Sequence, residues 1–319
     1  MEKQAAGMQT AGSRTAGSRT AGSRTAGSAR EDRTPTGLLL EPYGTGAVAE
    51  RSAVLESAKA IPRVLADLAA PRADRMSFRL TDHEVRLALA GPTGADPTTA
   101  PAPFAWSTRT ARRAVGLSAL RTLVAGVART PVEGVGRALD TAISAVRQGE
   151  ASATPMDRWL SGLSPSGLAA VQADSVTWAT RLWCALDWSA FDEAPLIGRD
   201  HWWDSPHSSL FALRSRAEVR SVAHDGDGTP FSVHLVVLGG SRRPSVKSEL
   251  AVVGLVEALG APCALRPGRV MGWWPDSGHT VTVEIDEPSL QAGVAAVTRT
   301  LAGTGSSPPS SEGIIRAAA

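Results

Sequence analysis

The spacing of apolar residues changes character close to Trp188. Before that point, apolar residues recur every three or four positions, which is the period of amphipathic helices. After it, they alternate with polar residues or form short continuous runs bounded by turn residues, as strands do. The chain is therefore expected to place helices first and a β-β-α-β-β-α series afterwards, which predicts an α/β or α+β sandwich.

Capping residues and breakers divide the first part of the chain. An amphipathic helix is expected over Ala47–Leu68, with Pro62 kinking or breaking it. Alternating apolar residues within Phe78–Leu89 predict a strand, and residues 91–103 predict a linker rich in Pro, Thr and Ala. Three further helices are expected to begin at capping signals: Ser107, Thr130 followed by Pro131, and Ser164 followed by Pro165.

The segment Leu210–Leu259 carries most of the information in the second part. Alternation predicts a strand over Phe211–Arg220, with Glu218 on the same face as the strand's arginines. A turn at Asp225–Gly228 leads to the apolar run Val233–Gly239, which is expected to be a strand buried on both faces. The remaining expected elements are a helix capped by Ser245, a hairpin over Arg269–Ile285 and a last helix from Pro288.

This order of elements resembles the core of PD-(D/E)XK nucleases of the RecB type, over roughly Ser107 to Leu301. That family shows a helix with Gly and, four residues later, His, then strands ending in Gly-x-x-Asp and (Asp/Glu)-x-Lys, and a helix with Gln and Tyr. Here Leu120 stands at the His position, four residues after Gly116. Glu218 is the one remaining acid, because Val237 and Gly239 occupy the acidic and Lys positions. The helix after Ser245 also lacks the Gln and Tyr at the expected spacing. The resemblance implies a mixed sheet flanked by helices.

The missing residues bear directly on activity. Phosphodiester hydrolysis by this design needs two carboxylates to hold Mg²⁺ and a Lys to activate water. The resemblance therefore implies a catalytically inactive nuclease-like protein without a cofactor, acting as a nucleic-acid-associated or protein-interaction module.

Two alternatives stay open. One is a Mg²⁺-dependent deoxyribonuclease with a migrated site, in which Glu218 and His201 hold the metal and Lys247 or Glu249 joins Glu218. Because residues two apart on a helix face different ways, at most one of Lys247 and Glu249 could point at Glu218. The other alternative is a scaffold protein that binds a protein partner through exposed tryptophans and does not bind nucleic acid.

Arginines are the candidate contacts to nucleic acid. Arg109, Arg112 and Arg113 share one side of a helix start, and Arg214 and Arg216 share a strand face. Guanidinium groups bind phosphate well, so both sets are candidate phosphate contacts. The competing interpretations are a solvated helix face for the first set and a salt bridge to Glu218 for the second.

The segment Asp200–His207 is the densest group of chemically capable side chains, with two His, two Asp and two Trp. Its His and Asp residues could ligate a divalent metal. Because Pro206 interrupts it, the segment is expected to be a loop, and the alternative is a structural turn that caps the next strand. Six of the nine tryptophans fall between Trp159 and Trp203, where core packing is expected.

Composition adds few constraints. The net charge of +2 gives no global field that would draw the whole molecule onto nucleic acid. Cys184 is expected to be a small core residue, and two isolated thiols, Cys184 and Cys263, give no zinc site. No apolar run is long enough to span a bilayer, so cytoplasmic residence and no membrane partner are expected.

Four segments are expected along the chain. Residues 1–36 contain a TAGSR repeat and predict a disordered tail, and residues 303–319 predict a second one. Residues 37–103 predict a helical and strand extension with its linker, and residues 104–302 the PD-(D/E)XK-like domain. DNA and a protein are the candidate partners, and the oligomeric state stays open.

Overall fold

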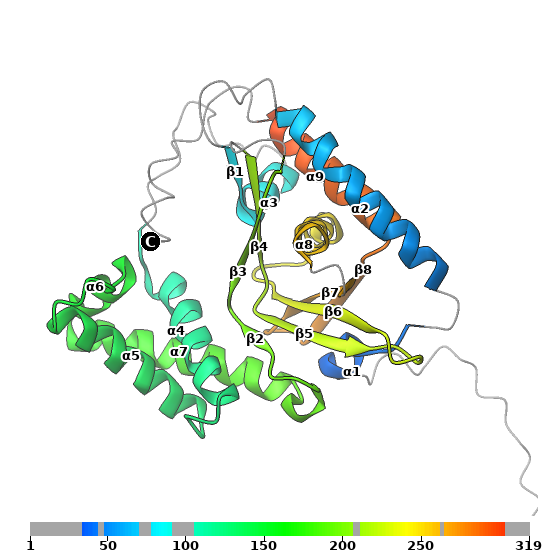
Figure 1. Cartoon of the computed structure of the whole chain (residues 1–319). Coiled ribbons are helices and arrows are strands. Elements are labelled where there is room, and N and C mark those ends of the chain that lie inside the picture. The colour runs from blue at the N-terminus through cyan, green and yellow to red at the C-terminus, as the bar shows by residue number, and fades with distance from the viewer. Residues whose placement is uncertain are drawn as a thin grey trace, which may run out of the picture. The chain divides into compact units, whose positions relative to one another are not determined.

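The computed structural model of the chain describes residues 34–43, 48–69, 78–90, 105–206, 211–261 and 265–303, all of them in one compact unit that begins at Thr34. The fold is mixed α/β, as expected, with helices packed around two sheets (Figure 1). The predicted linker at 91–103 and most of both predicted tails lie outside the described residues. The first tail is shorter than expected, since Thr34 caps helix α1 (Pro35–Leu39) and Leu39 is fully buried.

The larger sheet has five strands in the order β2-β5-β6-β7-β8. Strand β6 pairs in parallel with β7, and the other pairs are antiparallel, so the sheet is mixed. The strand β6 is buried over most of its length, as its apolar run predicted. The strands are β2 (Leu196–Ile197), β5 (Val219–His224), β6 (Pro230–Val237), β7 (Arg266–Trp274) and β8 (His279–Glu284).

The smaller sheet has three strands in the order β1-β4-β3. They are β1 (Phe78–Leu80), β4 (Phe211–Arg216) and β3 (Asp200–Asp204). The expected loop at Asp200–Asp204 is therefore wrong: this segment pairs antiparallel with β4 and joins the sheet. The strand expected over Phe78–Leu89 is also mostly wrong, because it ends at Leu80 and α3 (Asp82–Ala90) follows.

Helix α8 (Val246–Gly260) lies at the centre of the fold, between the strands and helices α2 (Val48–Ala69) and α9 (Glu287–Gly303) (Figure 1). Every residue from Leu250 to Ala258 is buried, so the helix is enclosed on all sides. Full burial of a Val or Leu side chain stabilises a fold by about 1.5–3 kcal/mol. The run LAVVGLVEA therefore anchors the core, and its single charged residue, Glu257, is buried with it.

The opposite face of the larger sheet packs against helices α4 and α7. Leu117, Leu120 and Leu182 of these helices contact the buried Phe231 and Leu235 of β6 in one apolar cluster. A second cluster holds the helices α4 to α7 together. Their bounds are α4 (Thr108–Val124), α5 (Pro131–Arg147), α6 (Pro155–Ser161) and α7 (Pro165–Ala185).

Three predicted caps are confirmed, since the hydroxyls of Ser107, Thr130 and Ser164 accept backbone N–H groups at the starts of α4, α5 and α7. The cap predicted at Ser245 is wrong, because its hydroxyl makes no cap hydrogen bond and donates to the Glu249 carboxylate instead. Gly116 of the Gly-Leu-Ser-Ala-Leu run lets α4 approach α7, because a Cβ there would lie 2.5 Å from Cε3 of Trp178. Helix α2 continues through Pro62, so a break there is wrong.

One expectation about side-chain exposure is wrong. Cys184 is exposed instead of buried, because the buried side chains of α7 face α4 and the sheet along another stripe. All nine tryptophans are buried or half-buried, which agrees with the core packing expected of them. None of the described helices combines the length and the apolar character needed to cross a membrane.

Candidate functional site

The chain changes sheets between β4 and β5. Strand β4 ends at Arg216 in the smaller sheet, β5 begins at Val219 in the larger one, and Ala217 and Glu218 connect them. The expectation of one continuous strand with Glu218 and the arginines on one face is therefore wrong. The connector is fixed by its backbone, since the Glu218 N–H donates to Leu235 O at 2.8 Å and the Gly198 N–H donates to Glu218 O at 2.8 Å.

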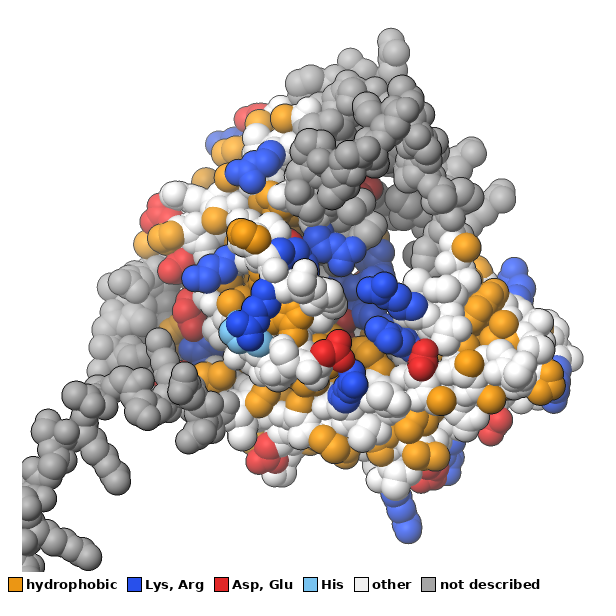
Figure 2. Space-filling model, turned by 180° about the vertical axis from the view of Figure 1, so that it is seen from behind, with side chains coloured by type: hydrophobic (Ala, Val, Ile, Leu, Met, Phe, Trp, Pro, Cys, Tyr) orange, Lys and Arg blue, Asp and Glu red, His pale blue; other side chains and the backbone are white. Residues whose placement is uncertain are grey.

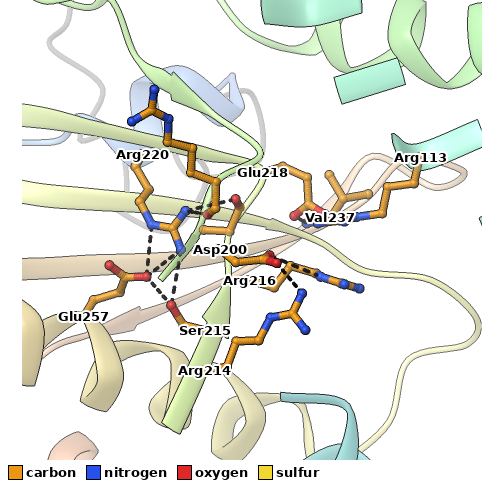
Figure 3. A network of polar contacts seen from close by, with 11 residues as sticks. Arg113, Asp200, Arg214, Ser215, Arg216, Glu218, Arg220, Val237 and Glu257 are labelled. Atoms are coloured by element: carbon orange, nitrogen blue, oxygen red, sulfur yellow. Dashed lines mark hydrogen bonds and ion pairs between the residues drawn. The ribbon is translucent and has the colours of Figure 1, made fainter. Parts of the chain in front are cut away.

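Glu218 is 1% exposed, and both oxygens of its carboxylate are occupied. Oε1 accepts from Arg113 Nε at 2.6 Å and lies 2.5 Å from Arg113 Nη2. Oε2 accepts the backbone N–H of Val237 at 2.7 Å. An arginine does satisfy Glu218, but it comes from α4 instead of from the neighbouring strand (Figure 3).

Arg214 and Arg216 on β4 both face Asp200 of β3. Arg214 Nη2 donates to Asp200 Oδ2, and Arg216 Nε lies 3.7 Å from Asp200 Oδ1. The guanidinium of Arg214 also lies over the ring of Trp202, 5.4 Å from its centroid. These contacts explain why Asp200–Asp204 is a strand, since they hold its polar end against β4.

We call the five arginines predicted to contact nucleic acid the arginine face: Arg109, Arg112, Arg113, Arg214 and Arg216. Arg109 is exposed and Arg112 is half-buried, and neither has an ion-pair partner among the described residues. The positive charges of Arg109 and Arg112 thus have no carboxylate partner among the described residues, while Asp200 and Glu218 pair with the other three arginines. Lys and Arg side chains also gather around a hollow on the side of the molecule seen in Figure 2.

The residues of the predicted migrated site are not joined to Glu218. Glu249 accepts from Arg243 Nε at 2.8 Å and from Ser245 Oγ at 2.7 Å, and the hydrogen bond with Glu249 raises the pKa of Arg243. Lys247 is exposed in the first turn of α8. No contact among the described residues joins Glu218 to Lys247 or Glu249. His201, the expected partner of Glu218 on a metal, instead contacts Glu257.

A second polar group surrounds Glu257, which is 5% exposed (Figure 3). Its Oε1 accepts from Arg220 Nε at 3.0 Å, from Arg220 Nη2 at 2.8 Å and from the Ser215 hydroxyl. Its Oε2 lies 2.8 Å from His201 Nδ1 and 3.8 Å from His234 Nδ1. Strands β3, β4, β5 and β6 thus all direct a side chain at one carboxylate on the central helix.

This surrounding charge keeps Glu257 ionised and His234 neutral. Burial alone would raise the pKa of the Glu257 carboxyl, but the His201 hydrogen bond and the nearby charges, Arg220 included, hold that pKa below its usual range. The pKa of His234 is lowered to about 4, mainly by burial and also by the charges of Arg220 and His201, against the opposing effect of Glu257. At neutral pH the His201 Nδ1–H therefore donates to an ionised Glu257, and His234 is an uncharged imidazole.

A cavity of about 470 Å³ opens beside this group. Its polar wall includes Arg199, His201, Ser221, His234 and Glu257, and its apolar wall includes Leu196, Val222 and Leu265. The volume falls within the usual range of small-molecule sites, and apolar walls with a few polar groups are their usual composition. The described side chains form no group of three or more His, Cys, Asp or Glu residues arranged to hold a metal.

Glu257 and His234 were not among the predicted site residues, although the sequence carries a signal for both. Each is the one ionisable residue inside a mainly apolar run, LAVVGLVEA on the helix and FSVHLVV on the strand. A buried ionisable group needs a partner, so such a residue marks a polar site inside the core. Of the predicted metal cluster at Asp200–His207, His207 lies outside the described residues and Asp204 is exposed at the end of β3.

No protein-family model matches this chain, and neither does any curated protein. The relationship to PD-(D/E)XK nucleases therefore stays a prediction from the motifs around Glu218 and Val237. The geometry gives two sites of different character. At the first, Arg113 of the arginine face pairs with the buried Glu218. At the second, the buried Glu257 lines a cavity.

Proposed function

We propose that the protein binds nucleic acid through the arginine face and does not hydrolyse it. The observation that carries this proposal is the pairing of Glu218 with Arg113, because it puts a guanidinium group where the nuclease resemblance would require a metal ion. The neighbouring arginines are in excess over the carboxylates, which suits a phosphate backbone.

The absence of hydrolysis follows from the chemistry of the same residues. One carboxylate whose two oxygens already accept hydrogen bonds has little capacity left for Mg²⁺. Val237 contributes its backbone N–H and not a ligand, and Gly239 has no side chain that could activate water. The arginine face would then retain the binding part of the nuclease-like design without its catalytic part.

Binding is tested by titrating fluorescent single- and double-stranded DNA and RNA with the protein at several salt concentrations. Replacing two face residues together (Arg109→Gln with Arg112→Gln) should weaken binding about tenfold and reduce the salt slope by about two, since each phosphate contact contributes about one. The matched control changes two exposed arginines of equal charge outside the face, Arg129→Gln with Arg147→Gln, and should leave binding nearly unchanged.

Two results would overturn the proposal. Undetectable binding at low ionic strength to every nucleic acid form would remove the binding function. Cleavage with Mg²⁺ or Mn²⁺ that Glu218→Gln abolishes would show an active nuclease instead.

A further inference from the structure

The smaller sheet has one face buried against α8 and one face that reaches solvent. Directly opposed residues of an antiparallel pair share a face, and successive residues alternate between the two faces. The register of β3 and β4 therefore puts Trp203, Leu213 and Ser215 together on the inner face, where all three are buried beside α8. The outer face carries three opposed pairs: Asp200 with Arg216, Trp202 with Arg214, and Asp204 with Ala212.

The outer face is open and positively charged at the end where Arg214 and Arg216 lie. The Arg216 side chain is 40% exposed and the Asp200 side chain is 37% exposed. The single carboxylate of Asp200 faces both guanidinium groups, so this end of the face carries a net positive charge (Figure 3). Asp204 is exposed at the other end. A polyanion is therefore expected to lie over the arginine end and to avoid Asp204.

Trp202 places an aromatic ring within this charged surface. The ring is half-buried, so part of it reaches solvent, whereas the neighbouring Trp203 is 7% exposed. The guanidinium of Arg214 lies over the ring of Trp202, 5.4 Å from its centroid, and is itself held by Asp200. This contact fixes the orientation of the indole. A ring that is already fixed loses little side-chain freedom when a ligand stacks on it.

We propose that the protein selects single-stranded nucleic acid and stacks an unpaired base on Trp202. Proteins that bind single strands combine cationic side chains along the backbone with aromatic rings that stack on the bases. In a duplex the neighbouring bases cover each base face, so only an unpaired base can present its face to the indole. The inference rests on the proposed function, because the arginine face would hold the phosphates on either side of that base.

The base contact is tested by a cycle of two proteins and two ligands, with fluorescence anisotropy titrations of the full chain. The ligands are a short single-stranded DNA and the same strand built from abasic sites, which keeps the phosphates and lacks the bases. The wild type should bind the intact strand about tenfold more tightly, since one stacked base contributes roughly that much. Trp202→Leu should bind both strands with the same, weaker affinity, and its salt slope should not change because no charge is lost.

Two variants control for effects on folding. Trp202→Phe keeps a ring and should retain most of the preference for the intact strand. Trp159→Leu removes a half-buried tryptophan of α6, outside the arginine face, and should change neither affinity. If Trp202→Leu does not fold, the wild type still tests the proposal with a third ligand, a hairpin duplex with the same number of phosphates. The intact single strand should bind about tenfold more tightly than this duplex.

The outcomes separate this inference from the proposed function. Equal binding of the intact and abasic strands by the wild type would overturn the base contact and leave the binding of nucleic acid standing. An equal loss for both strands in Trp202→Leu, or tighter binding of the duplex than of the single strand, would do the same. No binding of any nucleic acid form would overturn the proposed function and this inference with it.

Discussion

Glu218 and Glu257 are two buried glutamates that each face an arginine, yet they differ in what surrounds them. Glu218 uses both oxygens within the protein, and Arg113 and the Val237 N–H close it off. Glu257 is also held by an arginine, Arg220, but its other oxygen lies beside two histidines, His201 and His234, and all three residues line a cavity. Burial of an acid therefore does not by itself indicate a ligand site.

The largest expected effect is a difference in stability between variants of Arg220 and of Arg113, the arginines that face the two acids. Arg220→Met should lower the free energy of unfolding by about 3–5 kcal/mol, because it leaves Glu257 charged and buried without its main cation. Arg113→Met should lower it by about 1–3 kcal/mol, since Glu218 keeps the Val237 N–H and the Arg113 side chain is 27% exposed. Urea unfolding of both variants measures the difference. A larger loss in Arg113→Met would contradict the comparison.

Low pH should lower the free energy of unfolding through His234 and Glu257. The pKa of His234 is about 4 in the folded protein and 6.5 in the unfolded chain, so the unfolded chain binds more protons between these values. The contribution of His234 to the free energy of unfolding is therefore complete above pH 6.5. It falls by about 1.4 kcal/mol per pH unit as pH drops toward 4. The lowered pKa of Glu257 adds a loss in the same direction below its ordinary value of 4.5.

Urea unfolding at pH 7, 5.5 and 4.5 checks this slope, with His234→Leu as the comparison. The variant should lose most of the slope between pH 6.5 and 4. An equal slope in both proteins would mean that His234 is not neutral in the folded state.

Two glycines give a smaller effect. A Cβ on Gly260 would lie 2.4 Å from His201 Nε2, and a Cβ on Gly116 would lie 2.5 Å from Trp178 Cε3. Each change to alanine should destabilise the fold by about 1–3 kcal/mol through overpacking. Urea unfolding of both variants measures the loss, and an unchanged stability in either would contradict the close contact at that glycine.

The sequence predicted the fold class and most helix starts because these depend on local chemistry. Ser107, Thr130 and Ser164 cap helices through hydroxyls that reach backbone groups only three residues away. The period of the apolar residues likewise indicated the change from helices to strands near Trp188.

The change of sheets at Ala217-Glu218 could not be predicted from alternation. No Gly or Pro marks the connector, and the apolar and polar residues keep alternating from β4 into β5. The partner of Glu218 lies 105 residues away on α4, and the partners of Glu257 lie up to 56 residues away on four strands. Such pairs depend on packing that a single sequence does not specify. The isolated charge of Glu257 in its apolar run was the available signal.

The contrast between the two acids is tested most directly by calorimetric titration of the wild-type chain and of Glu218→Gln with MgCl₂ under the same conditions. Mg²⁺ should give no binding that depends on Glu218, because Arg113 occupies that carboxylate. Mg²⁺ binding that Glu218→Gln removes would place a metal site at Glu218 and contradict the account of this acid as closed.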